Sequence, residues 1–162
     1  MKSELFLIEV KRGENMKKLT TAVDKGTINV AEALIKKAAE QLIKEAIKFY
    51  KKVGRRKAFA EFSNPKSRFT FRTIYIFVID RQGVVFAHGQ NKNLIGKQLI
   101  GLKDSDRKLF IKQIIDAAKV KKSGWVEYKW WNALTKKIAP KQTCFERTGD
   151  CIFGCGFTKL SK

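Results

Sequence analysis

A chain of 162 residues, 44% of them apolar and 11% aromatic, is long enough to bury a core and short enough to form one domain. The 35 lysine and arginine residues outnumber the 15 acidic ones, and the formal net charge of +20 makes nucleic acid, anionic membranes and acidic ligands the partners to weigh. This composition excludes a disordered chain, and the lack of any apolar run of about 18 residues excludes a transmembrane helix.

The pattern of the N-terminal segment, residues 1–21, does not indicate that it belongs to the domain. Its short apolar run at residues 5–10 is flanked and interrupted by acidic residues, and no clear signal peptide is present. A trimmed chain and a decayed signal at MKKLTTA are both compatible with this pattern. We expect residues 1–21 to be an N-terminal extension, either disordered or a remnant of a signal, and residues 22–162 to form the single domain.

Helical periodicity dominates the next part of the chain. Apolar residues from Val30 to Val53 recur at helical spacing, which predicts a long amphipathic helix with lysines on its outer side and a stop at Gly54. The segment RKAFAEF predicts a short second helix, and the break in SNPKSR precedes the first strand.

Sheet patterns follow. Residues 73–80, TIYIFVID, predict a strand that turns at RQG, where Gly83 permits a positive φ, and returns as VVFAH. The loop GQNKNLIGKQLIGLKD leads to a helix predicted over residues 105–120, with Asp104 or Ser105 as its cap.

The C-terminal third predicts a third strand and a second hairpin. The strand GWVEYKWW carries aromatic residues on both faces, so we expect both faces to be covered. The segment KQTCFERTGDCIFGCGFTK predicts a hairpin that turns near Thr148 and Gly149. Together these elements predict an α+β domain: a central antiparallel sheet of about five strands, a long N-terminal helix, and a helix between strands two and three.

Three cysteines exclude a complete set of internal disulfides. If the turn places Glu146 opposite Cys151, all three cysteines share one face, but Cys144 is only diagonal to Cys151 and Cys155. Diagonal neighbours lie too far apart for a disulfide, so free thiols are expected unless the register differs.

His88 is the chain's one histidine. No nucleophile motif accompanies it, and the cysteine spacing lacks the pairs of structural zinc sites, so we expect no enzymatic activity, no metal and no other cofactor. A ligand-binding role and a purely structural role both fit its place at the end of a strand.

The segments IYIFVIDRQGVVFAHG, NLIGKQLIGLKD, SGWVEYKWWN and APKQTCFERTGDCIFGCGFTK occur in an order and spacing that resemble the single Cache domains, small-ligand sensing modules of bacterial receptors. The resemblance covers about residues 24–159 and is closest to free-standing, one-domain members. It implies a PAS-like sheet with a pocket for a small organic molecule, often a carboxylate. It also implies that the ligand-binding residues are Tyr75, His88, Tyr128, Trp130 and Lys141.

Our leading hypothesis is a non-catalytic module that senses a small, anionic metabolite. The alternative is a basic interaction protein that binds nucleic acid, acidic lipid or an acidic protein through its lysine-rich surface. The lysines are dispersed among apolar residues, which disfavours nucleic acid. Candidate partners are a signalling protein and a second copy joined through the long helix. The resemblance implies a periplasmic or otherwise extracytoplasmic location, whereas the missing signal peptide leaves a cytoplasmic one open.

Overall fold

The computed structural model describes residues 25–132 and 134–160, so the predicted extension over residues 1–21 lies outside the described residues. The chain divides into two compact units. Of the first unit, Met1–Leu34 with Leu160–Lys162, the structure describes the first turns of a helix and a bond from Leu160 N to Glu32 Oε1 of 3.1 Å. The second unit, Ile35–Lys159, contains the rest of that helix and the whole sheet.

Two helices precede the sheet. Helix α3 spans Lys25–Val53, five residues longer at its start than predicted, and α4 spans Arg55–Phe62. Gly54 separates them with a φ of 81°, a conformation that favours glycine, so the predicted stop is confirmed. Among the described residues, no helix combines the length and apolar character needed to cross a bilayer.

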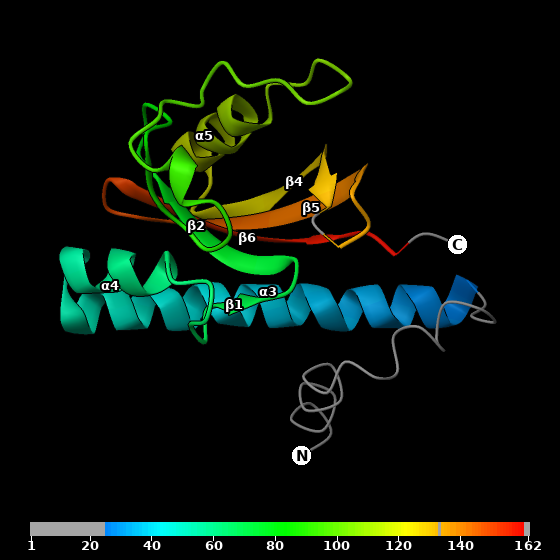
Figure 1. Ribbon diagram of the computed structural model, residues 1–162, viewed down its shortest axis with the longest axis horizontal. Helices are drawn as coiled ribbons and strands as arrows, with labels where there is room; N and C mark the ends of the chain where they lie inside the picture. The colour runs from blue at the N-terminus through cyan, green and yellow to red at the C-terminus, as the bar shows by residue number, and fades with distance from the viewer. Residues whose placement is uncertain (1–24, 133, 161–162) are drawn as a thin grey trace. The chain divides into compact units, whose positions relative to one another are not determined.

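The described residues form a six-stranded antiparallel sheet in the order β1-β2-β6-β5-β4, with β3 also paired to β2 (Figure 1). Both predicted hairpins are present, and the first and last long strands, β2 and β6, lie side by side in the centre. A two-residue strand that the sequence pattern did not predict, β1, raises the number from five to six. The bounds are β1 Thr70–Phe71, β2 Ile74–Ile79, β3 Val85–His88, β4 Ser123–Asn132, β5 Lys137–Thr148 and β6 Cys151–Thr158.

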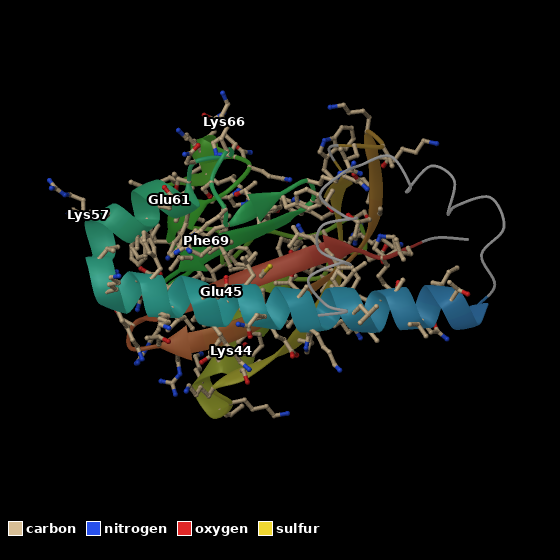
Figure 2. All side chains as sticks on the ribbon, turned by 90° about the horizontal axis from the view of Figure 1, so that it is seen from below. Lys44, Glu45, Lys57, Glu61, Lys66 and Phe69 are labelled. Atoms are coloured by element: carbon tan, nitrogen blue, oxygen red, sulfur yellow. The ribbon has the colours of Figure 1, made fainter. Side chains whose placement is uncertain are left out.

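The sheet is covered on two faces (Figure 1). Helices α3 and α4 cover one face, while α5, Phe110–Val120, lies on the other. Because strand side chains alternate, each long strand contributes to both cores. Figure 2 shows Phe69 on the inner side, against the sheet, while Lys57 and Lys66 point outward. Phe69 is fully buried among Phe49 and Phe62, so this face is held by tilted and edge-on aromatic rings.

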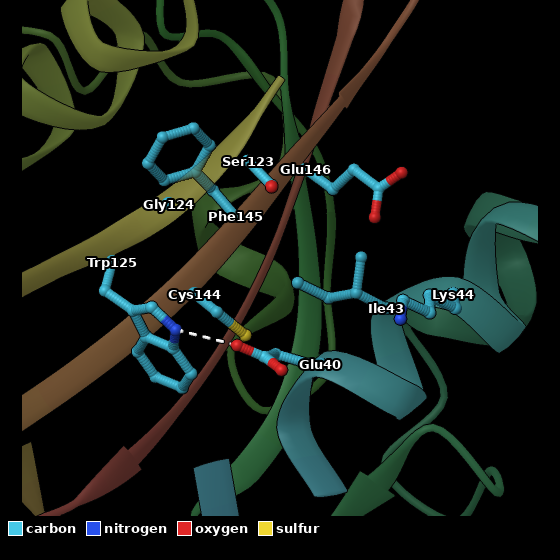
Figure 3. Close-up of a pocket in the computed structure, with 9 residues that line it drawn as sticks. All are labelled: Glu40, Ile43, Lys44, Ser123, Gly124, Trp125, Cys144, Phe145 and Glu146. Carbon is cyan, nitrogen blue, oxygen red and sulfur yellow. Dashed lines mark hydrogen bonds between the residues drawn. The ribbon is translucent and has the colours of Figure 1, made fainter. Parts of the chain in front are cut away.

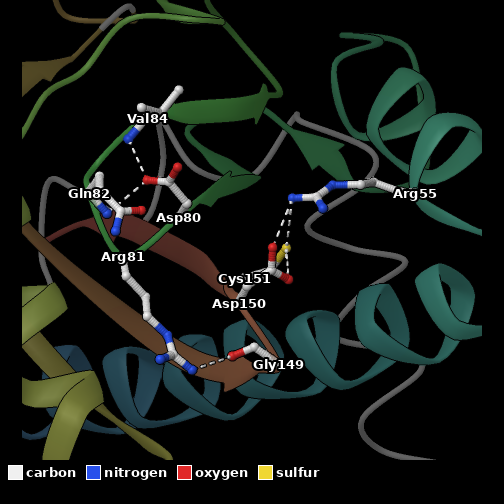
Figure 4. Close-up of polar contacts among 8 residues, drawn as sticks. All are labelled: Arg55, Asp80, Arg81, Gln82, Val84, Gly149, Asp150 and Cys151. Carbon is white, nitrogen blue, oxygen red and sulfur yellow. Dashed lines mark hydrogen bonds and ion pairs between the residues drawn. The ribbon is translucent and has the colours of Figure 1, made fainter.

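Polar contacts at one end of the sheet tie the turns together (Figure 4). Arg81, in the β2–β3 turn, donates to the carbonyl of Gly149 in the β5–β6 turn at 3.2 Å. Arg55 at the start of α4 pairs with Asp150 at 3.3 Å. Asp80 closes its own turn by accepting from Val84 N at 2.8 Å. These contacts set the position of both hairpin turns and of α4.

The start of α5 was predicted wrongly. The helix begins at Phe110 rather than at residue 105, and neither Asp104 nor Ser105 caps it. Asp104 instead closes a tight turn, in which its Oδ1 accepts from Asp106 N and Lys108 N at 2.9 Å each. An aspartate before a polar run can cap a turn as readily as a helix, and here the turn is formed.

The register of the second hairpin also differs from the expected one, in which Glu146 lay opposite Cys151. Thr148 pairs with Cys151 across a two-residue turn, so Cys144 lies directly opposite Cys155 rather than diagonal to it. All three cysteines are nevertheless free and share the face under α3 and α4. The predicted covering of both faces of β4 is wrong for one face, on which Glu127, Lys129 and Trp131 are exposed.

Candidate functional site

On the sheet face under α5, the pairing of β2, β6 and β5 brings a set of side chains next to one another. We call this set the floor of the site. Tyr75 of β2 pairs with Gly156 of β6, which pairs in turn with Thr143 of β5. A Cβ on Gly156 would overlap Thr143 Oγ1 and lie 2.9 Å from Lys141 Cε. The central strand therefore contributes space rather than a side chain, and Lys141 and Tyr75 meet across it. Gly156 is thus a requirement of the contact between Lys141 and Tyr75.

A cavity of about 30 Å³ lies between this floor, the loop before α5, and α5 itself. That volume holds about one or two water molecules. The walls are apolar and aromatic apart from one imidazole and two tyrosines. Its lining residues are Tyr75, Phe77, Ile79, Val85, His88, Leu94, Leu99, Leu102, Phe110, Ile111, Tyr128 and Trp130.

Lys141 is the unusual charge of this site. It is 4% exposed, and its Nζ donates to Tyr75 Oη at 2.9 Å and lies 4.1 Å from the centre of the Tyr75 ring. Within residues 25–132 and 134–160, no carboxylate forms an ion pair with it. Burial lowers the pKa of the Lys141 amino group. A phenol and a ring replace lost hydration only in part, so this cation would gain from a neighbouring anion.

Within the part of the chain that the structure describes, one ring nitrogen of His88 is bonded and the other has no hydrogen-bond partner. Its Nδ1 accepts from Asn91 N at 3.0 Å and from Gln90 N at 3.3 Å, which assigns the proton of the neutral ring to Nε2. Burial, followed by the charge of Lys141, lowers the pKa of His88 to about 4. The His88 ring centre lies 4.7 Å from that of Tyr75. Tyr75 therefore contacts both the imidazole and the ammonium.

His88 is expected to make stability depend on pH. Its folded-state pKa of about 4 lies below the ordinary histidine pKa of 6.5, so between these values the unfolded chain takes up the proton. The resulting stabilisation is complete above pH 6.5 and is lost as pH falls toward 4. Between pH 7 and pH 5, the free energy of unfolding measured in urea should fall by about 2 kcal/mol more for wild type than for His88→Gln. Parallel losses in the two proteins would contradict a buried, neutral His88.

Tyr128 and Thr143 complete the polar part of the floor. Tyr128 Oη lies 3.0 Å from Thr143 Oγ1, and burial raises the pKa of Tyr128 to about 12. The Tyr128 ring stacks on Phe110 of α5 with centres 4.1 Å apart, and Trp130 meets Phe110 edge-on at 5.3 Å. These contacts connect the site directly to the start of α5.

The structure brings the five predicted site residues to one face. Four of them line the cavity, and Lys141 reaches it through Tyr75. Sequence reasoning missed Thr143 and Gly156, although each has a signal: Thr143 is two residues from Lys141 on the same strand face, and Gly156 is a glycine inside a strand. Among the described residues, no three His, Cys, Asp or Glu side chains gather as metal ligands would.

A larger hollow of about 200 Å³ lies on the opposite face, between α3 and strands β4 and β5 (Figure 3). Part of its polar lining is already paired. Trp125 Nε1 donates to Glu40 Oε1 at 2.9 Å, and Glu146 lies 3.6 Å from Lys122 Nζ. The smaller cavity, with a buried cation beside it, is the stronger candidate for a ligand site.

Solved structures share this fold. A methyl-accepting chemotaxis protein from Vibrio parahaemolyticus RIMD 2210633 matches with 23% identity and a TM-score of 0.67, over 83% of this chain and 92% of that one. A periplasmic sensor domain of a chemotaxis protein matches with 21% identity and a TM-score of 0.60, over 78% and 91%. A Cache chemosensory domain solved for its carboxylic acid recognition matches with 18% identity and a TM-score of 0.67, over 84% and 99%.

No curated protein matches the chain. The family model for single Cache domain 2 matches residues 12–152, which is most of the sequence. The PAS-like sheet with a long N-terminal helix agrees with that match. The chain therefore belongs to the single Cache domain 2 family, whose members are small-molecule sensing modules.

Proposed function

We propose that this chain is a non-catalytic sensor that binds a small organic carboxylate in the cavity under α5. The observation that carries the proposal is Lys141, a buried cation without a carboxylate partner among the described residues, at the edge of an aromatic cavity. Recognition of a carboxylic acid by a structurally similar Cache domain supports the same ligand class. Burial strengthens such charge-assisted hydrogen bonds because water cannot compete for them.

Each polar residue has a separate role in the proposal. The ammonium of Lys141 pairs with the carboxylate, and the Nε2 proton of His88 donates to it. Tyr75 holds the lysine in place through the 2.9 Å bond and contacts the imidazole. Tyr128 and Trp130 enclose the apolar part of the ligand, which limits its size and excludes water.

Ligand entry requires the cavity to enlarge. A volume of about 30 Å³ is too small for even a short carboxylic acid. The part of the wall outside the sheet is the loop of residues 89–104, which contributes Leu94, Leu99 and Leu102, together with α5, which contributes Phe110. Binding would therefore displace this loop and helix, and that displacement is the signal we propose.

The remaining assignments rest on the sensory relatives. A periplasmic sensor domain among the structural neighbours supports an extracytoplasmic location, and the chemotaxis proteins support a signalling partner. We place the sensing domain at residues 22–162. Dimerisation through the long helix α3 belongs to the same proposal, and a mass measurement in solution tests it.

Thermal unfolding against matched ligand pairs tests the ligand class. Each short monocarboxylate is compared with its neutral amide at moderate salt, for example propionate with propionamide. A carboxylate at about 100 times its Kd is expected to raise the unfolding midpoint by roughly 5 °C or more, because it binds the native state alone.

Two results would count against the proposal. An equal rise with the amide would show that the charge of Lys141 does not contribute to binding. A flat panel, with the midpoint shifted by polyanions at low salt and restored by added salt, would instead favour the lysine-rich surface as the functional feature.

A further inference from the structure

The hairpin between β4 and β5 ends in an exposed apolar patch. Trp131 and Ile138 are direct cross-strand partners, and they are 52% and 54% exposed. Leu134, in the turn, is 57% exposed. We call these three residues the tip patch. The hairpin extends past the end of its neighbour β6, whose last paired residue, Thr158, lies opposite Lys141.

Hydrogen bonds join the described residues of the turn beside the tip patch. Asn132 is buried, and its Oδ1 accepts from Leu134 N at 2.9 Å and from Thr135 N at 3.3 Å. Lys136 N donates to the Asn132 carbonyl at 2.9 Å. Three large apolar side chains exposed on one hairpin are costly in water, so the patch is expected to have a partner.

The charge around the tip patch indicates the class of that partner. The chain has no acidic residue from Tyr128 to Phe145. Lys136 and Lys137 stand beside the patch with exposed side chains, and no described residue forms an ion pair with either of them. The next lysine, Lys129, is already paired with Asp106 at 2.9 Å.

We propose that the β4–β5 hairpin tip docks on the surface of an anionic lipid bilayer. Tryptophan is favoured at the membrane interface, where leucine and isoleucine side chains can enter the outermost hydrocarbon. The ammonium groups of Lys136 and Lys137 then lie at the level of the acidic headgroups. This surface is separate from the cavity under α5, so the inference does not depend on the ligand proposed there.

Vesicle co-sedimentation of the full chain tests this proposal. Wild type is expected to bind phosphatidylcholine vesicles that contain phosphatidylglycerol and to bind phosphatidylcholine alone weakly. The triple substitution Trp131→Ser, Leu134→Ser and Ile138→Ser should weaken binding by at least about tenfold, because it removes the inserted apolar surface. Val120→Ser is the matched control: this residue, the last of α5, is 82% exposed, and its replacement should leave binding unchanged.

A pair of lysine variants separates local docking from general attraction. Lys136→Gln with Lys137→Gln should weaken binding about tenfold, whereas Lys51→Gln with Lys52→Gln removes the same charge from the end of α3 and should have little effect. Equal losses from the two pairs would overturn the proposal in favour of diffuse surface charge. Two other results would overturn the proposal by assigning the patch to a protein contact. One is a wild-type dimer in solution that the triple substitution converts to a monomer. The other is a triple variant that, without lipid, is much less stable than wild type.

Discussion

Replacing Lys141 with methionine is expected to abolish carboxylate binding while leaving the unliganded protein as stable as wild type or more so. Truncating one partner of a buried, hydrogen-bonded charge pair costs about 2 to 5 kcal/mol, so the affinity should fall by at least about 30-fold. Stability should not fall, because methionine removes a buried cation that lacks an anionic partner among the described residues. Calorimetric titration and urea unfolding of the same two proteins measure both effects.

Lys137→Met is the matched control for this variant. Lys137 lies on the same strand, four residues earlier, with an exposed side chain. Its replacement removes the same charge from the protein but should change carboxylate affinity little. Similar losses in the two variants would show that net charge, rather than the buried ammonium, drives binding.

Gly154→Ala is expected to destabilise the domain by about 3 kcal/mol, at the upper end for an overpacked core. Gly154 pairs with Phe77 of β2 and with Phe145 of β5, and a Cβ there would overlap the Phe77 ring. Both neighbours are central strands, so the backbone has little freedom to move away. The free energy of unfolding in urea measures the loss.

Two further proteins check the cause of that loss. Gly101→Ala adds the same methyl group where no atom lies within 4 Å, and should be nearly neutral. Adding Phe77→Leu to Gly154→Ala should recover part of the stability, since the smaller side chain leaves room for the Cβ. A double variant less stable than Gly154→Ala alone would contradict the predicted clash.

The local elements of this domain were readable from residue patterns. Helix α3 follows from apolar spacing, and the turn at Gly83 follows from a glycine between two β-rich runs, confirmed by a φ of 83°. The site residues came from the family resemblance rather than from chemistry. Tyr75 and Lys141 are 66 residues apart, and no local pattern states that they meet.

The features that the sequence did not predict depend on which of several possible partners a residue contacts in the folded chain. Asp104 could cap a helix or a turn, and its bond to Lys129 N at 2.9 Å, 25 residues away, favours the turn. The register at Cys144 depended on the length of one turn, and a difference of two residues moved its partner to Cys155. The aromatic residues on both faces of β4 suggested full cover, but Trp131 is exposed and belongs to neither buried cluster.

A crystal structure of the protein grown with the carboxylate that most raises its unfolding midpoint would test the proposed site most directly. We predict carboxylate density in the cavity under α5, within hydrogen-bond distance of Lys141 Nζ and His88 Nε2, with the loop of residues 89–104 displaced. Density instead in the hollow beside Glu40 and Trp125, with Lys141 still bonded to Tyr75 alone, would contradict it.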